Sequence, residues 1–119
     1  MELGAKATVI IPAYNEQDVI AGTILEIKEL GSEYGILVVD DGSQDDTAAL
    51  AKQAGAEVVS HPYNKGYGAS LKTGIEYSPS DVVVFFDADA QHEAKDIPRM
   101  VEMLQTFFIR RISTSVSSP

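Results

Sequence analysis

The fold of this chain is decided by Val82-Val83-Val84-Phe85-Phe86-Asp87-Ala88-Asp89-Ala90-Gln91-His92. The first five residues are apolar and β-branched or aromatic, as is typical of a buried strand. Two aspartates follow with one residue between them. Residues two apart in an extended backbone point to the same side, so Asp87 and Asp89, with Gln91 after them, are predicted to converge.

Converging carboxylates need a compensating positive charge. Two carboxylates about 4 Å apart repel by roughly 4 kcal/mol at an effective dielectric constant near 20. A hard divalent cation with oxygen ligands is the usual partner of such a pair. The alternative is a strand followed by an acidic loop that caps a helix, and the Asp-x-Asp pattern taken alone favours that alternative.

The composition limits the classes of protein to consider. A chain of 119 residues with 45% apolar and 23% charged residues suits one globular domain. Its 18 acidic and 9 basic residues give a formal charge of −9, which argues against a nucleic-acid surface. The negative charge is compatible with a metal ion that is held by carboxylates and in turn binds an anionic substrate. The absence of cysteine excludes disulfides and thiolate metal sites.

The two ends of the sequence carry different signals. The start lacks the positive region and apolar core of a signal peptide, and no apolar run approaches the roughly 18–20 residues of a membrane span. We therefore expect a cytoplasmic protein. Residues 1–108 are predicted to form one domain. The Ser-rich stretch 109–119 is interpreted as a disordered tail, a non-native remnant or an abrupt truncation.

Strand and helix patterns alternate along the chain. Short apolar runs predict strands at 7–11, 35–39, 57–60 and 82–86. Helical spacing of apolar residues predicts helices at 16–30, from 43 or 45 to 53, 67–77 and 97–108. Asn15 is expected to cap the first helix, and Ser43 or Asp45 the second.

Such alternation predicts an α/β fold with an open, doubly wound, mostly parallel sheet and flanking helices. In these sheets ligands bind at the carboxyl ends of the strands, where the strand order switches. Each unusual polar cluster of this chain follows a predicted strand, and the clusters are 12–16, 40–43, 61–68 and 87–92. The four loops are therefore expected to meet at one edge of the sheet.

As an ordered set, these loops resemble the nucleotide-sugar half of a family 2 glycosyltransferase of the GT-A fold. The nearest likeness is to the dolichyl-phosphate mannosyltransferase-like and polyprenyl-phosphate glycosyltransferase branch. The matching segments are Val9-Ile10-Ile11-Pro12-Ala13-Tyr14-Asn15-Glu16, Val38-Val39-Asp40-Asp41-Gly42-Ser43 with Asp46-Thr47, Asn64-Lys65-Gly66-Tyr67-Gly68, and Asp87-Ala88-Asp89-Ala90-Gln91-His92. They extend from about Thr8 to Leu104 in the order and spacing of the family.

The resemblance implies a role for each motif. The residues that it assigns to the nucleotide sugar are Pro12, Ala13, Tyr14, Glu16, Asp40, Asp41, Asp87 and Ala88. Tyr14 and Glu16 would lie near the base and ribose, Asp41 would accept hydrogen bonds from one of them, and Asp40 would support that turn. Asp87, Asp89 and Gln91 would hold Mg²⁺ or Mn²⁺ against the diphosphate, with Asp89 as the catalytic residue.

Several of these residues also have a purely structural explanation. Tyr14 could pack on the first helix, and the helix dipole alone favours Glu16 near a helix start. Asp40 and Asp41 suit a turn and a helix cap. His61 and His92 are interpreted as loop histidines rather than metal ligands.

The implied activity is inverting transfer from a UDP- or GDP-sugar, with a polyprenyl phosphate as acceptor at the inner membrane face. Relatives are longer and build the acceptor site in a second half, so we expect a truncated chain whose exposed sheet edge favours homo-oligomers. The first alternative is therefore a nucleotide-binding fragment without transfer activity. A receiver domain is less favoured, because no strand ending in a lysine follows Asp87. The turn 12–16 also lacks the glycines of a pyrophosphorylase or dinucleotide site.

Overall fold

The computed structural model describes residues 7–88 of the chain. Within this range the elements alternate between strand and helix, in the order β1 (Ala7–Ala13), α1 (Ile20–Lys28), β2 (Tyr34–Asp40), α2 (Thr47–Gln53), β3 (Glu57–Ser60), α3 (Tyr67–Tyr77) and β4 (Val83–Phe85). The predictions for β3 and α3 agree with the structure at both ends. The predicted helix 97–108, the tail 109–119 and the residues Asp89, Gln91 and His92 lie outside the described residues.

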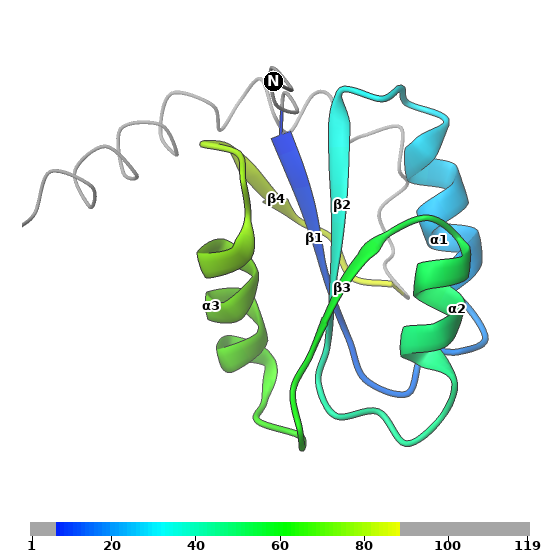
Figure 1. The fold of residues 1–119 in the computed structure, drawn as a ribbon, viewed down its shortest axis with the longest axis vertical. Helices are drawn as coiled ribbons and strands as arrows, with labels where there is room; N and C mark the ends of the chain where they lie inside the picture. Colours follow the sequence, from blue (N-terminus) through cyan, green and yellow to red (C-terminus); the bar gives the residue numbers. More distant parts are fainter. Residues whose placement is uncertain (1–6, 89–119) are drawn as a thin grey trace, which may run out of the picture.

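The strands form one parallel sheet in the order β3-β2-β1-β4 (Figure 1). The predicted open, parallel α/β sheet with flanking helices is therefore confirmed. The order begins at β1, continues through β2 to β3, and then returns to the other side of β1 for β4. A doubly wound sheet binds ligands at such a switch in strand order. A receiver domain would have the order 2-1-3-4-5, which this sheet does not follow.

The helices cover the two faces of the sheet unequally. Helices α1 and α2 lie on one face and α3 on the other (Figure 1), as right-handed crossovers require when the direction of strand addition reverses. Successive residues of β1 face opposite sides, so Val9 and Ile11 belong to the larger apolar cluster and Ile10 to the smaller one. All three side chains are completely buried.

A buried glycine lets α3 approach the sheet closely. A Cβ atom built on Gly74 would overlap with Cγ2 of Ile10 in β1 and would lie 3.0 Å from its Cδ1. Glycine lowers helix propensity by about 1 kcal/mol relative to alanine. Close helix–sheet packing is therefore the physical reason for Gly74 inside this helix.

The expectation that Asn15 caps the first helix is wrong. Helix α1 begins at Ile20, and Val19 before it makes no side-chain capping bond. Asn15 adopts a left-handed backbone, with φ of +54°. Its side-chain oxygen accepts a hydrogen bond from the amide of Gln44 at 2.9 Å. The residue therefore joins the β1–α1 loop to the β2–α2 loop.

The start of α2 also differs from the expectation. Its N-cap residue is Asp46, which makes no side-chain capping bond. Asp45 accepts a hydrogen bond from the amide of Thr47, the first helical residue, at 3.0 Å. The hydroxyl of Ser43 accepts from the amide of Asn15 at 2.8 Å. These contacts fix two neighbouring loops at the carboxyl edge of the sheet.

Candidate functional site

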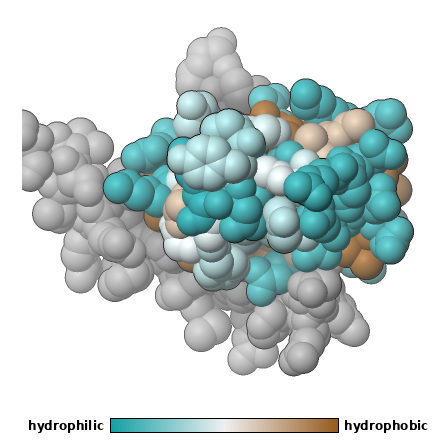
Figure 2. All heavy atoms as spheres, turned by 90° about the horizontal axis from the view of Figure 1, so that it is seen from below, coloured by the Kyte–Doolittle hydropathy of each residue, from teal (hydrophilic) through white to brown (hydrophobic). Residues whose placement is uncertain are grey.

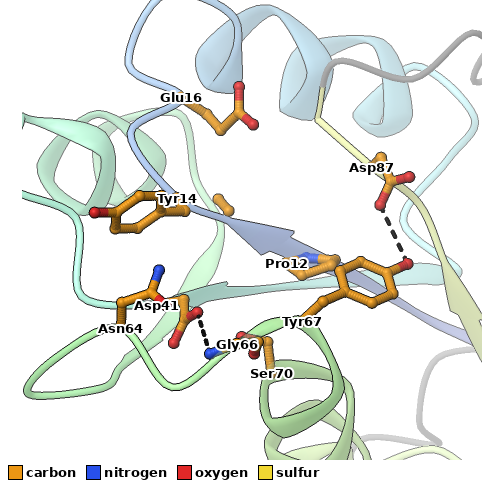
Figure 3. A pocket seen from close by; sticks show the side chains of 10 residues that line it. Pro12, Tyr14, Glu16, Asp41, Asn64, Gly66, Tyr67, Ser70 and Asp87 are labelled. Atoms are coloured by element: carbon orange, nitrogen blue, oxygen red, sulfur yellow. Dashed lines mark hydrogen bonds between the residues drawn. The ribbon is translucent and has the colours of Figure 1, made fainter.

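A pocket of about 400 Å³ opens at the carboxyl edge of the sheet. Its walls come from the ends of β1, β2 and β4, from the β3–α3 loop and from the first turns of α3 (Figure 3). The lining residues are Pro12, Ala13, Tyr14, Glu16, Asp41, Asn64, Gly66, Tyr67, Ser70 and Asp87. The face that carries these strand ends is mainly hydrophilic, as Figure 2 shows.

The pocket brings together most of the residues that the sequence analysis assigned to the nucleotide sugar. Pro12, Ala13, Tyr14 and Glu16 follow one another at and just beyond the end of β1. Asp41 directly follows β2, and Asp87 follows β4. The predicted meeting of loops from separate strands is confirmed for these residues.

Asp40 and Ala88, which were assigned to the same site, do not line the pocket. The buried carboxylate of Asp40 accepts hydrogen bonds from the amide of Ser43 at 3.1 Å and from the hydroxyl of Ser60 at 3.2 Å. The carbonyl oxygen of Ala88 accepts from the hydroxyl of Thr23 at 2.8 Å. Both residues therefore make hydrogen bonds within the protein next to the pocket and are not part of its lining.

Asp41 is the most constrained side chain of the pocket. It is 5% exposed, and its carboxylate accepts hydrogen bonds from the amides of Lys65 at 2.8 Å and Gly66 at 2.9 Å. Nδ1 of His61 lies 2.7 Å from its Oδ1. Burial acts to raise the pKa of Asp41, but the hydrogen bonds of His61, Lys65 and Gly66 favour the charged form more strongly, and the net pKa is lowered. Asp41 is therefore ionised at neutral pH.

His61 is the residue whose role sequence reasoning missed. It is buried, and its second ring nitrogen, Nε2, lies 2.8 Å from the hydroxyl oxygen of Thr73 in α3. Because an ionised carboxylate can only accept, Nδ1 of His61 carries the proton toward Asp41. The only available signal was that His61 follows a predicted strand at the carboxyl edge.

Tyr14 does not pack into the core. Its side chain is 44% exposed, and the ring stands at the pocket beside Asn64 and Asp41 (Figure 3). Glu16 is half-buried, and its amide donates to the hydroxyl of Thr47 at 2.9 Å. The carbonyl oxygen of Glu16 also accepts from the amide of Ile20 at 2.9 Å, so Glu16 is held between the starts of α1 and α2.

The far wall of the pocket carries Tyr67 and Asp87. The hydroxyl of Tyr67 donates to the carboxylate of Asp87 over 3.4 Å, which is a long hydrogen bond at an exposed position. Burial, the negative charge of Asp87 and this hydrogen bond all raise the pKa of Tyr67. The lining residues that the sequence analysis did not assign to the site are Asn64, Gly66, Tyr67 and Ser70.

The predicted metal ligands are only partly within the described residues. Asp87 is exposed and presents a carboxylate to the pocket, which is the kind of oxygen donor that Mg²⁺ and Mn²⁺ prefer. Asp89 and Gln91 lie beyond the last described residue. Within residues 7–88, no cluster of three or more His, Cys, Asp or Glu side chains could hold a metal ion.

Comparison with known proteins gives the family. Residues 8–108 match the model of glycosyl transferase family 2, and the chain belongs to this family. The expected GT-A glycosyltransferase fold is thereby confirmed.

In the part of the chain that is described, no helix has the length and apolar character needed to span a membrane.

Three similar proteins illustrate the family. The undecaprenyl-phosphate 4-deoxy-4-formamido-L-arabinose transferase of Pseudomonas fluorescens is 41% identical over 105 residues, covering 80% of this chain and 31% of that protein. Glucosyl-3-phosphoglycerate synthase from Mycobacterium tuberculosis, solved with Mn²⁺, UDP and glucosyl-3-phosphoglycerate, superposes with a TM-score of 0.74 at 32% identity, covering 85% of this chain and 40% of the other. A mannosyltransferase from Pyrobaculum calidifontis, solved with GDP-Man and Mn²⁺, gives a TM-score of 0.74 at 26% identity, covering 87% and 33%. The chain thus spans less than half the length of each.

Proposed function

We propose that this chain is the donor-binding part of a glycosyltransferase that uses a UDP- or GDP-sugar and transfers the sugar with inversion. The observation that carries the proposal is the single pocket to which the ends of β1, β2 and β4 contribute Tyr14, Asp41 and Asp87. This arrangement stands at a switch in strand order, where doubly wound sheets bind ligands. The related structures that contain UDP or GDP-Man support a donor of this class.

The charge of the pocket argues that a diphosphate enters together with a cation. The lining residues within the described range include the acidic side chains of Glu16, Asp41 and Asp87 and no lysine or arginine. A diphosphate placed beside Asp87 would be repelled unless a divalent ion lay between them. We therefore assign Asp87 as one ligand of Mg²⁺ or Mn²⁺ and retain Asp89 and Gln91 as the others. When bound, such an ion stabilises the negative charge of a departing diphosphate as a Lewis acid.

The remaining residues of the pocket are proposed to hold the nucleoside. Tyr14 presents an exposed aromatic ring that can stack on a base. Glu16 and Asp41 present acceptors for base or ribose hydrogen atoms. Residues 1–108 are proposed to form the domain around this site, and Asp89 is proposed as its catalytic residue.

The acceptor, the compartment and the assembly of the whole protein are proposals as well. An acceptor of the polyprenyl phosphate class is supported by the name of the Pseudomonas fluorescens relative. The oxygen of such an acceptor is already anionic, so it needs no general base. With a lipid acceptor, the compartment that we propose is the cytoplasm, at the inner face of the membrane. Homo-oligomers are proposed to form through an edge of the sheet, where β3 and β4 are the outermost strands within residues 7–88.

Calorimetry tests the donor site directly. We expect Mn²⁺ to strengthen the binding of a UDP-sugar or GDP-sugar. In an Asp87→Asn variant, this gain in affinity should be smaller by roughly tenfold or more. The matched control is Asp81→Asn, which removes an exposed carboxylate before β4, at the opposite edge of the sheet. Absence of binding by any donor, or equal losses in both variants, would contradict the proposal.

A further inference from the structure

The β3–α3 loop is folded around the carboxylate of Asp41. His61 begins this loop and is 8% exposed. Its ring lies between Oδ1 of Asp41 at 2.7 Å and the hydroxyl oxygen of Thr73 at 2.8 Å. The loop ends with the amides of Lys65 and Gly66, which donate to the same carboxylate. One buried imidazole therefore links the end of β2, the end of β3 and the middle of α3.

We propose that His61 is a positioning residue of the donor pocket, which holds the Asp41 carboxylate in one orientation so that its remaining acceptor site serves the bound nucleotide. This inference rests on the proposed function. A carboxylate offers about four acceptor sites. Three of them are used within the protein, two on Oδ1 by His61 and Lys65 and one on Oδ2 by Gly66. The geometry thus leaves one acceptor site on a residue that lines the pocket.

The turn after β2 and the β3–α3 loop are packed closely against each other. A Cβ atom on Gly42, the residue after Asp41, would overlap with the backbone of Tyr63 and lie 2.6 Å from the amide nitrogen of Asn64. The turn and the loop are therefore in direct contact. Without the imidazole, Oδ1 would lose one of its two donors, and the amides of Lys65 and Gly66 alone would hold the carboxylate.

The hydrogen bond between Nε2 of His61 and Thr73 holds the imidazole in place. Because Nδ1 donates to Asp41, Nε2 of a neutral His61 accepts a hydrogen bond from the hydroxyl of Thr73. Thr73 lies in the same helix as Tyr67 and Ser70, which line the pocket. The hydrogen-bond chain therefore sets the position of Asp41 relative to the wall that α3 contributes.

A double-mutant cycle on the full chain tests this role, with Mn²⁺ plus UDP and Mn²⁺ plus GDP as the probes in calorimetry. His61→Phe keeps a ring of similar size and removes both nitrogens. We expect at least about tenfold weaker nucleotide binding, as for the loss of a hydrogen bond to a charged group. In an Asp41→Asn background the same substitution is expected to add less than about twofold, because residues that act through one another are not additive.

A conservative variant separates positioning from bulk packing. In His61→Asn the amide nitrogen can take the place of Nδ1 toward Asp41, so most of the lost affinity should return. The matched control is Thr8→Val, which removes a buried hydroxyl bonded to Ser80 at 2.8 Å near the amino end of the sheet. This variant should lower stability and leave the dissociation constant unchanged.

Each result decides the inference. A folded His61→Phe variant that binds as well as the wild type, or one that weakens binding equally with and without Asp41→Asn, overturns it. If His61→Phe does not fold, Thr73→Val replaces it in the cycle with the same criterion. If Asp41→Asn abolishes binding, failure of His61→Asn to recover affinity overturns the inference. If the wild type binds neither probe, the proposed function fails first and the role of His61 falls with it.

Discussion

Replacing Gly74 by alanine tests whether the contact between α3 and the sheet is as tight as the structure shows. Alanine in place of glycine inside a helix contributes about 1 kcal/mol of stability through backbone entropy. At Gly74 the added Cβ would overlap with Cγ2 of Ile10 and lie 3.3 Å from its Cγ1. Ile10 is completely buried, so it cannot move out into solvent to relieve the overlap.

The expected net effect follows from these two contributions. Overpacking a dense core by one carbon costs typically 1–3 kcal/mol. Set against the gain in helix propensity, Gly74→Ala should lower the free energy of unfolding by up to about 2 kcal/mol. Gly22→Ala in α1 is the matched control, because a Cβ atom there would meet nothing within 4 Å. It should raise the free energy of unfolding by up to about 1 kcal/mol.

Urea unfolding at equilibrium measures both changes. With a slope near 2 kcal/mol/M, a loss of about 2 kcal/mol moves the midpoint down by about 1 M. The same substitution in an Ile10→Ala background should become neutral or stabilising, which gives a coupling free energy of roughly 1–3 kcal/mol. If Gly74→Ala stabilises the protein as much as Gly22→Ala, or if the coupling with Ile10 is absent, the packing argument is refuted.

Three further outcomes are expected. Thr23→Val should lower the free energy of unfolding by about 1 kcal/mol, since the carbonyl of Ala88 loses its buried donor; unchanged urea midpoints would contradict this. The folded-state pKa of Asp41 lies below its unfolded value, so the stability that it contributes is present above about pH 4 and is lost as the pH falls through the lower value. Asp41→Asn should therefore flatten the acid side of the stability profile below about pH 5, as urea unfolding at a series of pH values would show. Tyr67→Phe removes the long, exposed hydrogen bond to Asp87 and should change stability by less than about 0.5 kcal/mol, as thermal unfolding would show.

Periodic features of the chain could be predicted from the sequence. The apolar run Val9–Ile11 and the helical spacing of Ile20, Ile24 and Ile27 correctly indicated a buried strand and an amphipathic helix. The parallel sheet followed from the alternation of these elements, because parallel neighbours require crossover helices. The rule that places ligands at the carboxyl ends of strands then located Asp41 and Asp87 at one pocket.

Contacts between loops could not be predicted in this way. Asn15 is a residue type that often caps helices. Its side-chain oxygen instead accepts a hydrogen bond from the amide of Gln44, 29 residues further along the chain. Gln17 likewise accepts from the amide of Asp46 at 3.2 Å. Local preference identifies which residues can satisfy a backbone amide, whereas the fold decides which amide is within reach.

The part that His61 plays in the pocket was not visible in the sequence for the same physical reason. A histidine in a loop sequence suggests an exposed side chain, since burial of a polar ring without partners is costly. Here both ring nitrogens have partners, and those partners come from the turn after β2 and from α3. The cost of burial is thus offset only after three separate elements have come together. A side chain that can be buried only in the assembled site also helps to hold that site in one geometry, and this is why His61, rather than a pocket-lining residue, is the sharpest test of how Asp41 is positioned.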